Sequence, residues 1–247
     1  YSQYSFPFGL PELRAAIAEY TEKYLALTPD PNNEITVVLG ASEGMAAAFR
    51  GLFSPGDAVL IIEPFHEIYP AQLRIFELEP RFVTLRENST DGPWTLDLDE
   101  LKTASADPRV KGLILNTPHN PTGKVFGEEE LEAIAQICLS NDLLVISDEI
   151  YEHMVYDGHH HRSIATIDGM RERTMVVNSI SKTGRATGWR VGWVITPAKY
   201  TPRLRAIHDN LAVQAPTPLQ KGAVQLLTQP SGFFGAIAGH YRNKREQ

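Results

Sequence analysis

Residues 128–151 read EEELEAIAQICLSNDLLVISDEIY, and this stretch decides the fold. In its first half apolar residues recur at helical spacing, from Leu131 to Cys138, which predicts a helix over residues 128–140. In its second half residues 143–147 form a short continuous apolar run, which is typical of a strand that helices cover on both faces. A helix that leads directly into such a strand is the unit from which parallel α/β sheets are built.

The same alternation continues in both directions along the chain. Short apolar runs that indicate strands alternate with longer helical patterns, which predicts an α/β domain with a mainly parallel sheet. The expected strands are residues 35–39, 58–62, 81–85, 112–115, 143–147, 174–178 and 191–195. The expected helices are residues 11–24, 43–53, 68–77, 98–104, 128–140 and 202–211, with another beginning near Pro218.

Composition sets broad limits on what the chain does. Its 247 residues can form a substantial core, and 43% hydrophobic with 21% charged residues is ordinary for a soluble globular protein. The formal net charge of -7 argues against a nucleic-acid-binding surface, and no apolar run approaches the ~20 residues of a membrane span. The single cysteine, Cys138, excludes an intramolecular disulfide and its helical apolar pattern predicts a buried hydrophobe. One cysteine also fits a reducing compartment, so we expect a cytoplasmic protein.

The two ends of the sequence are abrupt. Residues 1–4 show neither a start methionine nor a leader, and residues 241–247 continue a helical stretch without a glycine or proline stop. We therefore expect the chain to be a piece of a longer protein.

Polar clusters follow several of the expected strands, and in sheets of this kind ligands bind beyond the carboxyl ends of the strands. Residues 40–44, GASEG, lead into a helix, where small residues and free amides suit a phosphate. A plain helix cap at Ser42 is the alternative. Residues 116–123 contain two prolines and a glycine, which fix a rigid turn and orient the amide of Asn120. Asparagine before proline is also a common turn former.

Two more clusters contain ionisable groups. Asp148 ends a buried strand, where a carboxylate is costly unless it meets a cation such as a protonated pyridine nitrogen, although it would also fit a helix cap. Lys182 follows residues 174–178, with Arg190 a little further on. A lysine there can form a Schiff base beside a phosphate, or be an ordinary surface charge. Together the clusters place a lysine, an aspartate, an asparagine, a tyrosine and phosphate donors at the carboxyl ends of expected strands.

In this combination the sequence resembles the class I aminotransferases, which are fold-type I pyridoxal-5′-phosphate (PLP) enzymes. The matching motifs, in the family's order and spacing, are NPTG at 120–123, DEIY at 148–151, SISK at 179–182 and TGWR at 187–190. The resemblance extends from Tyr4 and Gly9 to the last helix, and residues 148–193 look closest to the kynurenine, glutamine and methionine aminotransferase branch. It implies a three-layer α/β sandwich around a mainly parallel, mixed seven-stranded sheet. Residues 1–247 would be the PLP-binding large domain, with the family's N-terminal segment missing and its C-terminal small domain largely absent.

The resemblance also implies roles for individual residues. Lys182 would form the internal aldimine with PLP and move a proton during the reaction, and Asp148 would pair with the pyridinium nitrogen. Asn120 and Tyr151 would hydrogen-bond the phenolic oxygen of the cofactor, and His66 stands where the family usually stacks an aromatic ring. The phosphate would be held by the amide of Ala41, by Ser42, Ser179 and Arg190, and by Tyr4 of the neighbouring subunit in a homodimer.

Three departures from the family pattern matter. Phe65, beside His66, could rotate into the stacking position. Gly184 and Arg185 replace the aromatic and small residues that commonly follow the lysine, which predicts looser packing there. The family's carboxylate-binding arginine belongs to the small domain, so we expect the chain alone to bind PLP yet transaminate poorly.

The histidines at residues 159–161 are the one oddity of composition. In the family the corresponding stretch is a solvent-facing loop. Because three adjacent side chains cannot all face one metal ion on a regular element, we expect no metal site.

Three functions are compatible with these residues. The first is a PLP-dependent aminotransferase acting on an L-amino acid and a 2-oxo acid. The second is a PLP-dependent β-lyase or other eliminase, and the third is a non-catalytic PLP-binding sensor domain of a transcription regulator. The acidic charge and the intact lysine motif favour the aminotransferase, with small-molecule substrates and no nucleic-acid or membrane partner.

Overall fold

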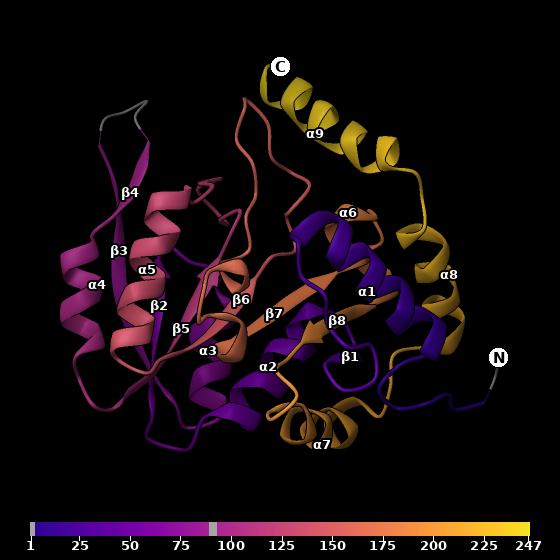
Figure 1. The fold of residues 1–247 in the computed structure, drawn as a ribbon, viewed down its shortest axis with the longest axis horizontal. Coiled ribbons are helices and arrows are strands. Elements are labelled where there is room, and N and C mark those ends of the chain that lie inside the picture. The colour runs from indigo at the N-terminus through magenta and orange to yellow at the C-terminus, as the bar shows by residue number, and fades with distance from the viewer. Residues whose placement is uncertain (1–2, 89–92) are drawn as a thin grey trace.

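A mixed eight-stranded sheet forms the middle layer of the molecule (Figure 1). The computed structural model describes residues 3–88 and 93–247, and in these ranges the strand order is β1-β8-β7-β6-β5-β2-β3-β4. Strands β2, β3, β5, β6 and β7 are parallel, whereas β8 is antiparallel to both β7 and β1, and β4 to β3. The strands are β1 (Ile35–Val38), β2 (Ala58–Glu63), β3 (Glu79–Glu87), β4 (Trp94–Leu96), β5 (Val110–Asn116), β6 (Leu144–Asp148), β7 (Thr174–Ser179) and β8 (Gly192–Ile195).

The α/β fold and all seven expected strands are confirmed, each within two residues of its predicted ends. The sheet nevertheless has eight strands rather than seven. The additional strand, β4, is only three residues long, which is too short to show a hydrophobic alternation in the sequence. It pairs with the long edge strand β3 and extends the sheet by one antiparallel strand.

Helices cover both faces of the sheet (Figure 1). The expected helices are confirmed, and the four-residue helix α6 is an addition that periodicity cannot show. No helix in the described ranges is both long and apolar enough to cross a membrane. The helices are α1 (Pro11–Leu25), α2 (Ala41–Leu52), α3 (Ile68–Ile75), α4 (Leu98–Ser105), α5 (Glu128–Ser140), α6 (Ile180–Thr183), α7 (Thr201–Ala212), α8 (Thr217–Leu227) and α9 (Ser231–Arg245), with 3-10 turns η1 (Ile164–Thr166), η2 (Arg171–Arg173) and η3 (Thr187–Trp189).

Successive residues of the central strands point to opposite sides and are buried on both. On β2, Leu60 and Ile62 join the core beneath α4 and α5, whereas Val59 and Ile61 join the core beneath α2, α3 and α7. Helices α1, α8 and α9 close a third core over β1, β7 and β8. Each buried aliphatic side chain of this kind is worth roughly 1.5–3 kcal/mol. Burial on both faces explains why the strands are continuous apolar runs in the sequence.

Cys138 on α5 is completely buried, as the sequence predicts. Burial raises the pKa of its thiol to about 12. The thiolate, which is the reactive form, is therefore scarce at neutral pH, and Cys138 acts as a packing residue.

Gly184, directly after α6, bears on the expectation of looser packing. A Cβ there would overlap the Leu226 side chain of α8 and lie 2.7 Å from the carbonyl oxygen of Ile180, so α8 packs closely on this turn. Two cavities of about 380 and 210 Å³ are nevertheless lined by Gly184 and Arg185, so the packing is close on the side of Leu226 and open beside it.

The strand register brings the polar clusters to one edge of the sheet. Asn116 at the end of β5 lies opposite Asp148 at the end of β6. Further along, Ser179 of β7 pairs with Gly192, which in turn pairs with Val38 at the end of β1. The segments after β1, β5, β6 and β7 therefore leave the sheet side by side.

Candidate active site

Asp148 is almost fully buried at the carboxyl end of β6, with 3% of its surface exposed. Its Oδ2 accepts a hydrogen bond of 2.7 Å from the hydroxyl of Tyr69, which lies on α3 and is itself buried. Burial raises the pKa of Asp148 above its ordinary value, and the Tyr69 hydrogen bond lowers it only in part. Such a carboxyl is poised to accept a cation, because a nearby positive charge stabilises the ionised form.

Tyr69 is a site residue that the strand-end clusters of the sequence do not include. It lies in the first turn of α3, the helix that follows β2, and in the sequence it is part of that helical pattern. Burial, and then the charge of Asp148, raises the pKa of its own hydroxyl well above the ordinary value, so it stays a donor. Inspecting the residues after β2 as well as those after β1, β5, β6 and β7 would have pointed to it.

Asn116 fastens the NPTG turn to the strand that ends in Asp148. Its amide donates to the Asp148 carbonyl oxygen at 2.9 Å, and its Oδ1 accepts from the Asn120 backbone N–H at 2.7 Å. Asn120 thereby keeps a set position beside β6, and its side-chain amide stays out of these bonds. In the sequence Asn116 is recognisable only as the first residue of the polar cluster.

Lys182 lies on α6, immediately beyond β7, and is partly buried. The hydroxyl of Ser179 caps this short helix by accepting from the Ser181 backbone N–H at 3.2 Å. The Lys182 Nζ lies 5.6 Å from the centre of the Tyr151 ring, which comes from the turn after β6. The lysine therefore points across the sheet edge toward the Asp148 side rather than out to solvent, as an ordinary surface lysine would.

The expected phosphate residues meet where α2 begins. Ala41 and Ser42 are the first two residues of α2, so Ser42 lies inside the helix and does not cap it. Arg190 packs across Gly40 so closely that a Cβ on Gly40 would overlap its Nη2. A Cβ on Gly192 would likewise lie 2.9 Å from the Ala41 nitrogen. Two glycines thus let an arginine and a helix N-terminus approach each other, which is an anion-binding arrangement.

His66 and Phe65 have separate surroundings. Phe65 stacks on Phe82 with ring centres 5.3 Å apart and an interplanar angle of 18°. His66 lies near Tyr69, with ring centres 5.8 Å apart, and its charged form acts on the Asp148 carboxyl. Of the two rings, His66 is the one beside the Asp148–Tyr69 pair.

Tyr4 lies largely clear of its own chain, since 81% of its surface is exposed. Its neighbour Ser5 is fixed, since the Ser5 backbone N–H and hydroxyl both donate to Gln214 at 2.7 and 2.8 Å. The arm that carries Tyr4 is thus anchored while the Tyr4 side chain projects from it.

Two buried carboxylates hold the turn that carries Tyr151. Glu149 accepts from Ser163 at 2.6 Å and contacts His161 Nε2 at 2.9 Å, and the hydroxyl of Tyr20 donates to Glu152. Burial raises the pKa of Glu152 to about 7. These contacts pin both sides of the turn to the body of the domain.

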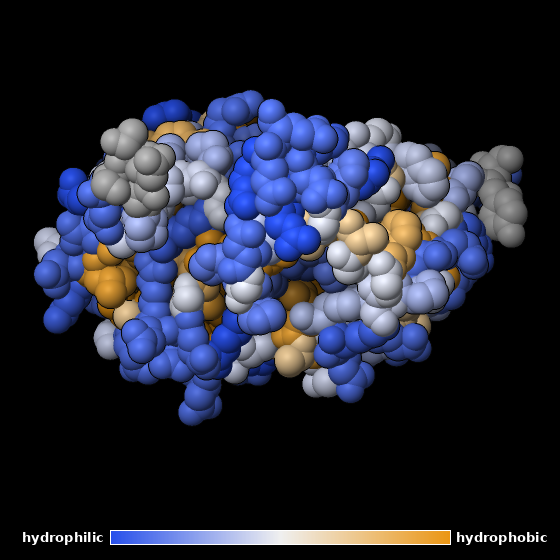
Figure 2. Space-filling model, turned by 90° about the horizontal axis from the view of Figure 1, so that it is seen from above, coloured by the Kyte–Doolittle hydropathy of each residue, from blue (hydrophilic) through white to orange (hydrophobic). Residues whose placement is uncertain are grey.

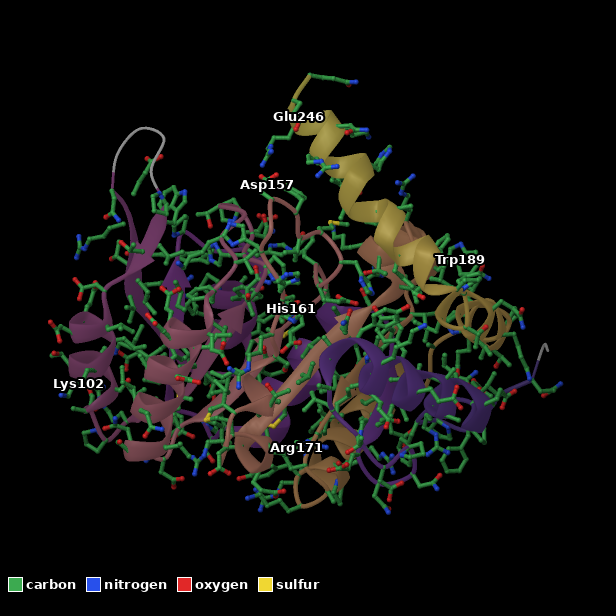
Figure 3. All side chains as sticks on the ribbon, turned by 45° about the horizontal axis from the view of Figure 1, so that its top comes forward. Lys102, Asp157, His161, Arg171, Trp189 and Glu246 are labelled. Atoms are coloured by element: carbon green, nitrogen blue, oxygen red, sulfur yellow. The ribbon has the colours of Figure 1, made fainter. Side chains whose placement is uncertain are left out.

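His161 differs from the rest of the histidine triplet. Its side chain is only 4% exposed, so a solvent-facing loop is the wrong description for it, although His159 and His160 are exposed. Figure 3 shows His161 within the body of the molecule, whereas Asp157 lies at the tip of the same loop near the end of α9. His161 is buried because its ring nitrogen contacts the buried carboxylate of Glu149. No group of three or more potential metal ligands comes together in the part of the chain that the structure describes.

A cavity of about 220 Å³ adjoins these residues. Seen from above in Figure 2, the surface is largely hydrophilic and hydrophobic residues show mainly in hollows. Three larger hollows, of about 460, 680 and 380 Å³, lie along α7, α5 and α8 and are lined by none of the expected site residues. The lining residues of the smaller cavity are Pro118, His119, Asn120, Pro121, Gly123, Tyr151, Met154, Tyr156 and Tyr241.

Comparison with known proteins decides the family. The family model described as "Aminotransferase class I and II" matches residues 1–246. The chain belongs to this family. Class I aminotransferases of this type use pyridoxal 5′-phosphate, so the expected fold, family and cofactor are confirmed.

Individual aminotransferases are similar over most or all of the chain. Kynurenine–oxoglutarate transaminase 3 of Mus musculus is 38% identical over the whole chain, and kynurenine–oxoglutarate transaminase 1 of Homo sapiens is 39% identical over 94% of it. The chain spans 57% and 58% of these relatives' own lengths. Among solved structures, N-succinyldiaminopimelate aminotransferase from Mycobacterium tuberculosis superposes with a TM-score of 0.96 at 37% identity, covering 99% of this chain and 63% of that one.

The residues of this aminotransferase chain fit the cofactor. Buried Asp148 suits a protonated pyridine nitrogen, and the glycine-lined approach of Arg190 to α2 suits a phosphate. Within the described residues, the side-chain polar atoms of Lys182, Asn120 and Tyr151 enter no hydrogen bond with the protein, so they are available to a ligand.

We predict that Gly40→Ala weakens PLP binding at least about tenfold, because displacing Arg190 removes a charged hydrogen bond of about 1.5–3 kcal/mol to the phosphate. The matched control is Gly56→Ala. Both glycines have positive φ, 77° and 90°, but nothing lies within 4 Å of a Cβ on Gly56. Titration of the apoprotein with PLP measures the affinity. Equal affinities for the two variants would show that PLP binding does not depend on the close contact between Arg190 and Gly40.

We also predict that Tyr69→Phe raises the pKa of Asp148 further, because the carboxylate loses its strongest donor. The ionised form exists above this pKa, so the acidic limb of PLP binding should move to higher pH. At neutral pH the affinity should fall about tenfold, as for a lost hydrogen bond to a charged group. The measurement is the PLP dissociation constant as a function of pH, with Tyr200→Phe as the control. An unchanged pH profile would contradict the role of Tyr69.

Proposed function

We propose that residues 1–247 are the PLP-binding large domain of an aminotransferase that moves an amino group between an L-amino acid and a 2-oxo acid. The observation that carries the proposal is Lys182, held at the edge of the sheet with its Nζ facing the Tyr151 ring, at the edge where Asp148 is buried. A lysine and a buried aspartate at neighbouring strand ends are the two ionisable groups that this chemistry needs.

PLP supplies a carbonyl carbon that an amine can bond and a pyridine ring that withdraws electrons from the reacting bonds. Lys182 is the amine that would hold the cofactor, and its free Nζ would move a proton at the substrate Cα. Asp148, oriented by Tyr69, would hold the proton on the ring nitrogen. Asn120 and Tyr151 would donate to the phenolic oxygen.

The remaining contacts would orient the cofactor. The amide of Ala41, the hydroxyls of Ser42 and Ser179, and the guanidinium of Arg190 would bind the phosphate, and His66 would lie against the ring. Arg190 makes one hydrogen bond within the described residues, from Nη1 to the Thr187 carbonyl at 2.9 Å, so its other N–H groups face the anion site. Arginine suits this position because its planar fork can give two parallel hydrogen bonds to a phosphate.

The relatives support amino transfer rather than elimination, since they are named transaminases and aminotransferases. Their substrates differ, however. Kynurenine with oxoglutarate, N-succinyldiaminopimelate and methionine appear among the names, the last for YbdL from Escherichia coli, whose structure has a TM-score of 0.92 at 32% identity and covers 99% of this chain and 63% of that one. The proposal therefore extends to the amino acid and 2-oxo acid classes and no further.

A homodimer with shared sites is part of the proposal. Tyr4 is supported for this role by its exposure and by the anchoring of Ser5 beside it, which together project the phenol away from its own chain. The proposed location is the cytoplasm, because the one cysteine is a free thiol, and cell fractionation tests it.

We predict that borohydride reduction of the full-length protein with PLP fixes the cofactor to Lys182, as peptide mapping would show. Lys182→Ala should lose transamination by about 10²–10⁴-fold, the usual contribution of a general acid–base group. Lys199→Ala, which changes an exposed lysine, is the control. A label on another lysine would contradict the assignment of Lys182 as the cofactor-binding residue. PLP binding without amino transfer, or release of a β-leaving group instead, would support the sensor or the eliminase.

We predict that an inactive Lys182→Ala subunit and a Tyr4→Ala subunit of low activity complement each other when mixed. Each mixed dimer should regain one competent site, since one of its two sites then has both the lysine and the partner's tyrosine. Activity is measured after mixed dimers are isolated with two affinity tags. If mixed dimers form and activity does not recover, the sites are not shared through Tyr4.

A further inference from the structure

His208 on α7 is a completely buried histidine outside the residues assigned above. Both of its ring nitrogens are engaged. Nδ1 lies 2.9 and 3.1 Å from the two carboxylate oxygens of Glu43, and Nε2 lies 3.1 Å from the carbonyl oxygen of Pro7. Glu43 is in the first turn of α2, directly after Ser42, and Pro7 is in the arm that carries Tyr4.

The partners of His208 determine its protonation. A carbonyl oxygen can only accept, so Nε2 carries a hydrogen. Glu43 Oε2 already accepts from the Leu39 backbone N–H at 2.9 Å, and the side chain belongs to the first turn of a helix, where a negative charge is stabilised. Nδ1 faces both oxygens of this carboxylate, so the geometry favours a hydrogen on Nδ1 too. The surroundings of His208 therefore stabilise its charged form.

The surrounding charges agree with this assignment. The carboxyl groups that act on the ring are Glu43, from α2, and Asp209, its neighbour on α7, and among residues 3–10 of the arm the contact is with the Pro7 carbonyl. Burial lowers the pKa of His208, but the hydrogen bond and charge of Glu43 outweigh burial, and the pKa lies above its ordinary value.

Through these contacts the His208 side chain joins α7 to the start of α2 and to the N-terminal arm. Glu43 in turn accepts from the backbone N–H of Leu39, which lies between the end of β1 and the turn at residues 40–42. Pro7 belongs to the arm, which is also hydrogen-bonded to β1. There the Val37 N–H donates to the Phe8 carbonyl oxygen at 3.0 Å. The phosphate-binding turn and the Tyr4 arm are thus fixed to the same buried cation.

We propose that His208 is a positioning residue that fixes the phosphate-binding turn and the N-terminal arm together, and that its charge offsets Glu43, an anion next to the phosphate donors. Without this cation the charge of the Glu43 carboxylate would oppose phosphate binding at the start of α2. The inference rests on the proposed function, because it assumes that α2 binds the phosphate of the cofactor.

The charge on His208 makes the effect depend on pH. Its folded-state pKa is raised above the unfolded value of about 6.5, so the stabilisation is complete below about pH 6.5 and is lost as the pH rises through the folded pKa. Phosphate affinity should weaken over the same range of pH.

The experiment measures binding of inorganic phosphate and of PLP to the full-length apoprotein between about pH 6 and pH 9. His208→Gln, which is neutral, should weaken phosphate binding about fivefold at the acidic end and remove the histidine-dependent part of the pH profile. His159→Gln, an exposed histidine, is the control. In the double variant Glu43→Gln/His208→Gln both charges are gone, and affinity should recover above that of His208→Gln alone.

Three results would overturn the proposal. They are an unchanged phosphate affinity and pH profile in His208→Gln, no recovery in the double variant, and an NMR titration of the wild-type protein showing His208 neutral below about pH 6.5. The NMR titration needs no variant, so it decides the matter even if His208→Gln fails to fold. Failure of Lys182 labelling would overturn the proposed function, whereas these results with labelling intact would overturn only the role of His208.

Discussion

The burial of the Asp148 carboxylate is the constraint on which the rest of the site depends. A nearly dehydrated carboxylate is unfavourable unless donors or a cation surround it, and the described residues supply chiefly the Tyr69 hydroxyl. The carboxylate is therefore suited to a cation such as the protonated ring nitrogen of the proposed function. Tyr69, Asn116 and the carboxylates behind Tyr151 keep that position rigid before any ligand arrives.

The same principle of balanced charge operates at the opposite end of the site. The helix N-terminus at Ala41 and the guanidinium of Arg190 attract an anion, while Glu43 opposes it and His208 offsets Glu43. Under the proposed function, this arrangement attracts the phosphate to the start of α2, while the charge of Glu43 is paired with His208. The ring end and the phosphate end are joined through the sheet edge, where Ser179 and Gly192 are paired.

The sequence predicts much of the fold, because strands buried on both faces give continuous apolar runs that can be read locally. It does not predict β4 or α6, which are too short to show any period. The residues at strand ends were also predictable, since topology alone brings them together. Tyr69, His161 and His208 were not, because each is identified by a partner that is distant in the chain, 79 residues away for Tyr69, 12 for His161 and 165 for His208. At Gly184 the sequence does not show that one side of the residue packs closely against Leu226 while cavities lie beside it.

Lys182 and Arg190 belong to one short connection between the antiparallel neighbours β7 and β8, which has a consequence for how the site assembles. Closing that connection brings residues 179 and 192 together, whereas the Asp148–Tyr69 bond closes a loop of 79 residues. Because the entropy of loop closure grows with the logarithm of length, the longer loop costs about 1.5 kcal/mol more. Lys182 and Arg190 are thus organised by a local connection, whereas the Asp148–Tyr69 pair forms only once the distant α3 has docked on the sheet.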